Sequence, residues 1–259
     1  MPQSRTRFFS NAAAWALALA LGLAACKPSP DGTAAPAAGR SLAATAPAQA
    51  VRQLTAHLRA NDFESFAREV VPPGMQPRLR QAWSEGRTRW PLDELPFGRR
   101  LPSILDALSK PGAEAGLQRI FDRQFAGAAS ELSGTATSLG LFGARYIEQD
   151  PGYSDEERQH YTQLVAAASA WGARAPLADR QRAKQSIGQL AAAARRTGLA
   201  SEADFAKAGM DDSLRRVSGF SVALKQVLAR YGLDLDADLA SLEATLQQQT
   251  GDDALVRMR

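Results

Sequence analysis

The pattern of apolar and polar positions predicts a succession of short and medium helices. From residue 47 onwards, apolar residues recur three and four positions apart, which places them on one face of an α-helix. Prolines, glycines and N-capping residues separate these stretches at short intervals. The expected helices lie at about 47–60, 61–71, 76–87, 103–150 with interruptions, 154–174, 177–198, a short one from 201, one ending at 232 and a last one at 234–251.

Two stretches in the middle of the chain differ in how strongly they favour a helix. Ser154 and Glu157 form the sequence pattern of a capping box, which predicts a helix start. The stretch 133–143 is crowded with small residues, and glycine lowers helix stability by about 1 kcal/mol relative to alanine. A helix at 133–143 therefore needs a closely packed neighbour.

The last apolar pattern predicts a helical hairpin at the C-terminus. Leucines alternate at intervals of four, three and four residues, at positions 235, 239, 242 and 246. This is an a/d seam, and it predicts a final helix packed antiparallel to the helix before it. We expect an all-α fold, an irregular multi-helix bundle with a C-terminal antiparallel helical hairpin. We expect one helical domain over 47–251, followed by a polar tail over 252–259. In an alternative interpretation, the helical domain divides into two subdomains near 100–112 or 150–153.

The first residues of the chain have the plan of a secretory signal. Arg5 and Arg7 precede an apolar run of about ten residues, 12–21, and no acidic residue accompanies them. A bilayer span needs about 20 apolar residues, so this run is too short to cross a membrane. The alternative interpretations are an ordinary signal peptide cut at a small-residue site, or a buried helix.

The four residues Leu23-Ala24-Ala25-Cys26 follow this run and contain the only cysteine of the chain. They resemble the lipobox of bacterial lipoproteins. The resemblance implies a diacylglyceryl group on the Cys26 thiol, cleavage between Ala25 and Cys26, and acylation of the new amino group. Residues 1–25 are then a removed signal peptide, and residues 26–46 are a lipidated cysteine with a flexible tether. Each buried methylene contributes about 0.8 kcal/mol, so two or more acyl chains anchor the protein stably.

The expected location follows from the resemblance and from the residue after the cysteine. In the enterobacterial sorting rule, Lys27 rather than aspartate favours the outer membrane. We therefore expect a lipid-anchored protein of the bacterial cell envelope that faces the periplasm. Lipidation of Cys26 excludes a disulfide, a thiol nucleophile and a cysteine-based metal site in the mature chain.

The charge balance argues against nucleic acid as a partner. Loss of Arg5 and Arg7 with the signal peptide leaves 29 of the 31 basic residues against 27 acidic ones. Proteins that bind nucleic acid show a concentrated basic face, and a secreted location argues further against this function.

Metal and cofactor chemistry has little support in the sequence. Glu156, Glu157 and His160 have ligand spacing, but di-iron bundles need a second such unit and two further glutamates. Aspartates at 234, 236 and 238 imitate the first half of a calcium loop, and the pattern then fails at Leu239 and Thr245. We expect no metal and no cofactor.

Catalytic motifs are also lacking. The sequence contains no Gly-x-Ser-x-Gly and no glycine loop that would hold a phosphate. A pair of carboxylates distant in sequence stays open, so the alternative to a non-enzymatic role is a carboxylate-based hydrolase acting on a cell-wall or surface polymer.

An irregular stretch rich in arginine and aromatic residues is the candidate binding surface. Guanidinium groups bind phosphate and carboxylate in bidentate fashion and stack on aromatic rings. The candidate residues are Trp83, Arg87, Arg89, Trp90, Phe97, Arg99 and Arg100. The alternative is a surface loop whose aromatic residues fill the core. The sequence thus predicts a membrane-anchored periplasmic lipoprotein, a non-enzymatic binding or accessory component whose partner is an envelope protein or an anionic lipid.

Overall fold

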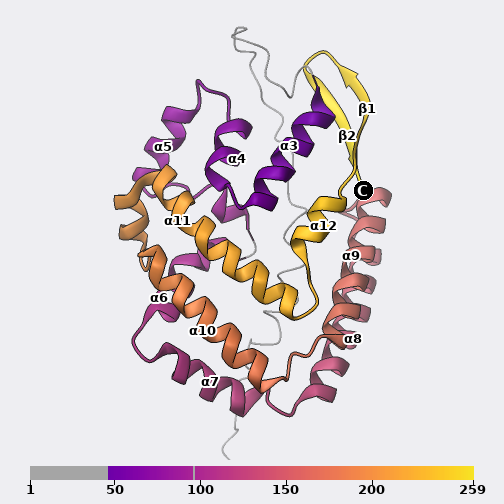
Figure 1. Ribbon diagram of the computed structural model, residues 1–259. Coiled ribbons are helices and arrows are strands. Elements are labelled where there is room, and N and C mark those ends of the chain that lie inside the picture. The colour runs from indigo at the N-terminus through magenta and orange to yellow at the C-terminus, as the bar shows by residue number, and fades with distance from the viewer. Residues whose placement is uncertain (1–45, 96) are drawn as a thin grey trace, which may run out of the picture.

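The computed structural model describes residues 46–95 and 97–259 (Figure 1). The predicted signal peptide, Cys26 and nearly all of the predicted tether lie outside the described residues. The described residues form ten α-helices, two short 3₁₀ helices and one two-stranded antiparallel sheet. The prediction of a helix-dominated fold is therefore confirmed.

Three helices begin the described part of the chain: α3 (Pro47–Ala60), α4 (Phe63–Val70) and α5 (Gln76–Ser84). Proline in the first turn starts α3, as its fixed φ allows. The sequence pattern predicts Asn61 as the N-cap of α4. Instead Asn61 ends α3 with φ 58°, and Asp62 caps α4 by accepting a hydrogen bond from the Ser65 amide at 2.9 Å.

The core forms around the long helix α11 (Glu202–Arg230), which α4, α5 and α10 (Arg180–Thr197) contact. Along the chain, α5 is followed by two 3₁₀ helices, η1 (Leu92–Glu94) and η2 (Gly98–Arg100). The helices α6 (Leu101–Ser109) and α7 (Ala113–Gln124) come next, and both α6 and α7 pack on α10. Trp83 is fully buried in this core and donates its indole N–H to the Phe205 carbonyl at 3.3 Å. A single non-helical residue, Gly209 with φ 74°, kinks α11.

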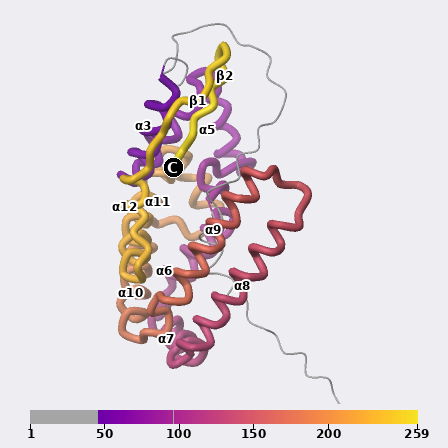
Figure 2. The backbone as a smooth tube through the Cα atoms, turned by 90° about the vertical axis from the view of Figure 1, so that its right-hand side faces the viewer, coloured from indigo at the N-terminus to yellow at the C-terminus, as the bar shows by residue number. Residues whose placement is uncertain are grey.

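A helical hairpin, which we call the arm, is formed by α8 (Ala129–Gln149) and α9 (Asp155–Arg174). Its two helices pack on each other, and Figure 2 shows α8 on the side away from α10, α11 and α12. The predicted capping box starts α9, because Ser154 Oγ accepts from the Glu157 amide at 3.2 Å and Glu157 Oε2 accepts from the Ser154 amide at 2.8 Å.

The small residues of α8 are what bring the two arm helices close together. A Cβ added at Gly140 would lie 2.2 Å from Ser169 Oγ, a distance that side chains do not tolerate. The Ser169 hydroxyl donates to the Ala136 carbonyl at 3.0 Å and so joins α9 to the backbone of α8. The close neighbour that a helix at 133–143 requires is therefore α9.

The C-terminus differs from its prediction. The helix α12 (Leu235–Ser241) is short, and two antiparallel strands follow it, β1 (Ala244–Thr250) and β2 (Asp253–Met258). The predicted helix to residue 251 and the predicted helical hairpin are wrong, and the segment expected as a polar tail supplies β2. Gly251 adopts φ 60° and reverses the chain, so that the tail pairs with 244–250. Arg52 on α3 donates a hydrogen bond to the Ala244 carbonyl at 2.8 Å, which joins β1 to α3.

No helix in the described ranges is both long and apolar enough to cross a membrane.

We expect Gly140→Ala to destabilise the protein by about 1–3 kcal/mol, because the added methyl group forces the arm helices apart. The matched control is Gly134→Ala on the same helix, where an added Cβ meets nothing within 4 Å. That variant should be as stable as the parent or more stable by up to about 1 kcal/mol, because alanine favours a helix. Urea unfolding followed by circular dichroism measures both, and equal effects of the two substitutions would contradict the close packing of α8 on α9.

Candidate functional site

The two tryptophans of the predicted binding surface belong to the core instead. Trp83 is fully buried, and Trp90 is half-buried and stacks on Phe66 with ring centroids 6.3 Å apart. Phe97 is half-buried and precedes η2 with φ 66°. The two tryptophan side chains pack in or against the core and do not present a stacking surface to a partner.

Arg89 is a structural residue that holds the loop after α5 onto the core. Its side chain is 12% exposed, and its guanidinium lies 5.3 Å from the centre of the Trp83 ring. It donates to the Trp83 carbonyl at 2.6 Å and to Glu202 Oε2 at 3.1 Å. Arg89 therefore uses its charge within the fold.

The remaining arginines of the predicted surface stay exposed. Arg87 pairs with Glu85, two residues before it at the end of α5, and hydrogen bonds from Gln81 and Arg87 lower the pKa of the Glu85 carboxyl group. Arg99 and Arg100 lie on η2. The structure therefore does not bring the seven predicted residues together as one exposed face.

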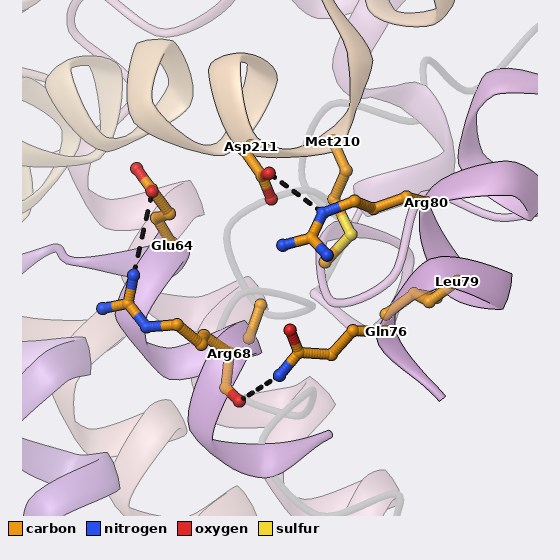
Figure 3. Close-up of a pocket in the computed structure, with 8 residues that line it drawn as sticks. Glu64, Arg68, Gln76, Leu79, Arg80, Met210 and Asp211 are labelled. Atoms are coloured by element: carbon orange, nitrogen blue, oxygen red, sulfur yellow. Dashed lines mark hydrogen bonds and ion pairs between the residues drawn. The ribbon is translucent and has the colours of Figure 1, made fainter. Parts of the chain in front are cut away.

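A small surface hollow lies beside this stretch, where α4, α5 and α11 meet (Figure 3). We call it the arginine hollow. Side chains from all three helices line it: Glu64, Ala67, Arg68, Gln76, Leu79, Arg80, Met210 and Asp211. Ala67 is buried in its floor, and Leu79 and Met210 add further apolar surface.

Local sequence signals build the walls of the arginine hollow. The segment 72–74, Pro-Pro-Gly, separates α4 from α5. The Gln76 amide bridges this turn, because it donates to the carbonyls of Arg68 at 3.0 Å and Val71 at 3.3 Å. On the opposite wall the kink at Gly209 places Met210 and Asp211 at the rim.

The charges of the arginine hollow are arranged as ion pairs. Arg80 Nε lies 3.0 Å from Asp211 Oδ2, which joins α5 to α11. Glu64 lies between two arginines, with Oε1 3.9 Å from Arg68 Nη1 and Oε2 3.5 Å from Arg215 Nε.

Both arginines of the hollow keep donors for a further partner. Arg68 and Arg80 are each about half exposed, and a guanidinium group carries five N–H donors, more than one ion pair uses. In Figure 3, Arg80 reaches from α5 towards Asp211, and its terminal nitrogens point into the hollow. The arrangement can accept a carboxylate or phosphate whose attached group contacts the apolar floor.

The acids of the hollow are less suited to catalysis. Glu64 and Asp211 both lie in ion pairs with arginines, so neither is a free acid facing a second one. Elsewhere in the described residues, the carboxyl groups with a shifted pKa are all shifted downwards, mainly by hydrogen bonds donated to the carboxylate: Asp62, Glu85, Glu114, Asp179 and Asp204. A general acid requires a raised pKa, so these shifts give no support to the hydrolase alternative.

The acidic residues with metal-like spacing have structural partners. Asp234 caps α12 by accepting from the Ala237 amide at 3.1 Å, and Asp236 lies 2.7 Å from the ammonium of Lys225. His57 Nε2 lies 3.0 Å from Glu69 Oε1, a contact between α3 and α4. Across the described ranges there is no group of three potential metal ligands.

Arg89→Ala should destabilise the protein by about 1–3 kcal/mol, because it removes one of the two donors to the Trp83 carbonyl, the other being the Gly86 amide, and leaves Glu202 without its partner. Arg99→Ala is the control, since Arg99 is exposed and its loss should change stability by no more than about 0.5 kcal/mol. Thermal unfolding compares the two. A neutral Arg89→Ala variant would show that Arg89 is available for binding after all.

No family model, no curated protein and no solved structure matches this chain. The chemistry of the arginine hollow is therefore inferred from its own lining: two half-exposed guanidinium groups that are each paired with a carboxylate, one glutamine amide and an apolar floor.

Proposed function

We propose that the chain is a lipid-anchored protein of the bacterial cell envelope that acts as a non-enzymatic binding or accessory component. Its ligand is an acidic group, a carboxylate or a phosphate, carried by an envelope protein or by an anionic lipid. The observation that carries this proposal is the presence of Arg68 and Arg80, from two different helices, in one small hollow with an apolar floor.

The shape and charge of the arginine hollow support a binding role. An acidic group that enters the hollow replaces water around Arg80 and contacts Leu79 and Met210 with its apolar part. Charge-assisted hydrogen bonds of this kind are roughly twice as strong as neutral ones, and a bidentate arginine contact adds directional specificity. Asp211 and Glu64 hold the two guanidinium groups in place, which lowers the entropy lost when a ligand binds.

The proposed anchor fits a binding protein that must reach a partner. A tether of twenty flexible residues has an average end-to-end distance of roughly 25 Å. The helix α3 begins at Pro47, immediately after the segment that we propose to be this tether. A domain on such a tether searches the space near the membrane while the acyl chains keep it there.

The anchor is tested by Cys26→Ala. This variant should lose incorporation of radiolabelled lipid and should leave the membrane fraction, because the thiol is the proposed acceptor of the diacylglyceryl group. Lys27→Asp is the control, since it keeps the cysteine and should keep lipid labelling while moving the protein towards the inner membrane under the enterobacterial rule. Lipid labelling that persists in Cys26→Ala would refute the assignment.

The arginine hollow is tested by photo-crosslinking in intact cells from a photo-reactive residue in place of Met75, which is exposed and precedes the hollow residue Gln76. We expect crosslinked products from the parent chain, and loss of most of them when Arg68→Ala and Arg80→Ala are combined, because the acidic group then lacks its guanidinium partners. Arg78→Ala, an exposed arginine on the same helix outside the hollow, is the matched control and should keep the products.

The identity of the product distinguishes the two sources of the acidic group. A protein partner gives a product of defined higher mass, whereas a lipid partner gives a small mass addition to the modified peptide. Equal crosslinking from the double variant and from Arg78→Ala would contradict binding in the arginine hollow. Circular dichroism of the double variant confirms that its helices are retained.

A further inference from the structure

The helix α8 has a second apolar face that nothing in the described structure covers. Phe142 and Tyr146 are 69% and 68% exposed, and Leu139 on the same face is also exposed; Leu141, 62% exposed, lies on a different side of the helix. A separate face of α8, about 100° away around the helix axis, packs on α9 through Ala136, Gly140 and Ile147. An α-helix with two apolar faces is made to pack against two neighbours, and the arm supplies one of them.

The spacing on the exposed face is that of a helix–helix seam. Leu139, Phe142 and Tyr146 follow each other at intervals of three and four residues. Thr135 and Gln149 continue the pattern on either side and are exposed as well. A seam with this period takes another helix, whose side chains insert between these residues.

Charges beside the seam indicate which helix fits. Glu131, Ser138 and Arg145 are seven residues apart, so they form one line along the edge of the seam, with the acid and the base about 21 Å from each other. Glu131 accepts a hydrogen bond from the Ser130 hydroxyl at 3.1 Å, and neither Glu131 nor Arg145 has an ion pair within the described part of the chain. A line with one acid and one base, placed symmetrically about Ser138, is complementary to an antiparallel copy of itself, and the second acid of α8, Glu148, lies on a different side of the helix.

We propose that two copies of this chain associate through α8, with the two helices antiparallel and the two-fold axis at Ser138. Glu131 of each copy then faces Arg145 of the other copy, which gives two equivalent ion pairs. This is an isologous interface, in which the same surface of both copies is buried. The proposal concerns a surface different from the arginine hollow and does not depend on how that hollow functions.

The acidic tip of the arm favours the antiparallel orientation over the parallel one. Asp155, Glu156 and Glu157 lie together at the start of α9 and are exposed. A parallel pair would bring two such tips together and would leave Glu131 and Arg145 without partners. In the antiparallel pair the tips lie at opposite ends, so the repulsion is avoided. The same acids disfavour an anionic lipid surface as the occupant of this face.

Disulfide trapping tests the proposal in the purified full chain. Ser138→Cys places two thiols next to the two-fold axis, and oxidation with copper phenanthroline should convert at least about half of the chain into a dimer. Mass spectrometry should find a disulfide between two copies of the peptide that contains position 138. The parent chain and Ala166→Cys, at an exposed site on α9, are the controls and should not form a disulfide-linked dimer through α8.

Charge reversal tests the orientation. Glu131→Arg and Arg145→Glu, each added to Ser138→Cys, should lower the trapped dimer at least about fivefold, because each places like charges opposite each other. The two reversals combined should restore it. Arg68→Ala with Arg80→Ala should leave trapping unchanged, so failure of this proposal is separate from failure of the arginine hollow.

Three results would overturn the proposal: no 138–138 disulfide, equal trapping from position 166, or failure of the combined reversal to restore what the single reversals remove. A disulfide to a different protein in cell extracts, without the 138–138 product, would assign this face to that partner instead.

Discussion

The carbonyl of Phe205 is the point on which much of the fold depends. A kink at Gly209 interrupts the regular hydrogen bonding of α11, and an interrupted helix leaves backbone carbonyls that need other donors. Trp83 and Ser213 both donate to Phe205 O at 3.3 Å, and both side chains are fully buried. The tryptophan thereby fixes α5 against α11. Because the same kink places Met210 and Asp211 beside α5, the arginine hollow exists only where this contact holds.

Arginine has three distinct roles in this chain, which explains why composition alone misplaces the site. Arg89 is nearly buried and stabilises the loop after α5, Arg87 pairs with a neighbouring glutamate, and Arg80 reaches a different helix beside a hollow. Clustering in sequence favoured the stretch from 83 to 100. The two residues that join across the hollow, Arg80 and Asp211, are 131 positions apart, so no local pattern indicates their contact.

What the sequence predicts well is local, and what it misses is decided by distant contacts. The capping box at Ser154 and the need of the 133–143 helix for a close neighbour follow from residues within one or two turns, and both agree with the structure. The C-terminal strands depend on 253–258 pairing with 244–250 and on Arg52 holding β1. A leucine pattern with helical period cannot indicate that pairing, because backbone hydrogen bonds between the strands outweigh the pattern.

The arm packs little on the rest of the protein, and self-association would give α8 a further packed face. Its helices pack mainly on each other, and Trp171 Nε1 joins the arm to the body by donating to the Tyr231 carbonyl at 2.9 Å. A partner on α8 adds a second packed face, and binding to the folded form alone stabilises that form by mass action. Where the chain is anchored by lipid, as we propose, two copies share one membrane surface. Their effective concentration is then raised, so a weak α8 interface is sufficient for pairing in the membrane although it would dissociate in dilute solution.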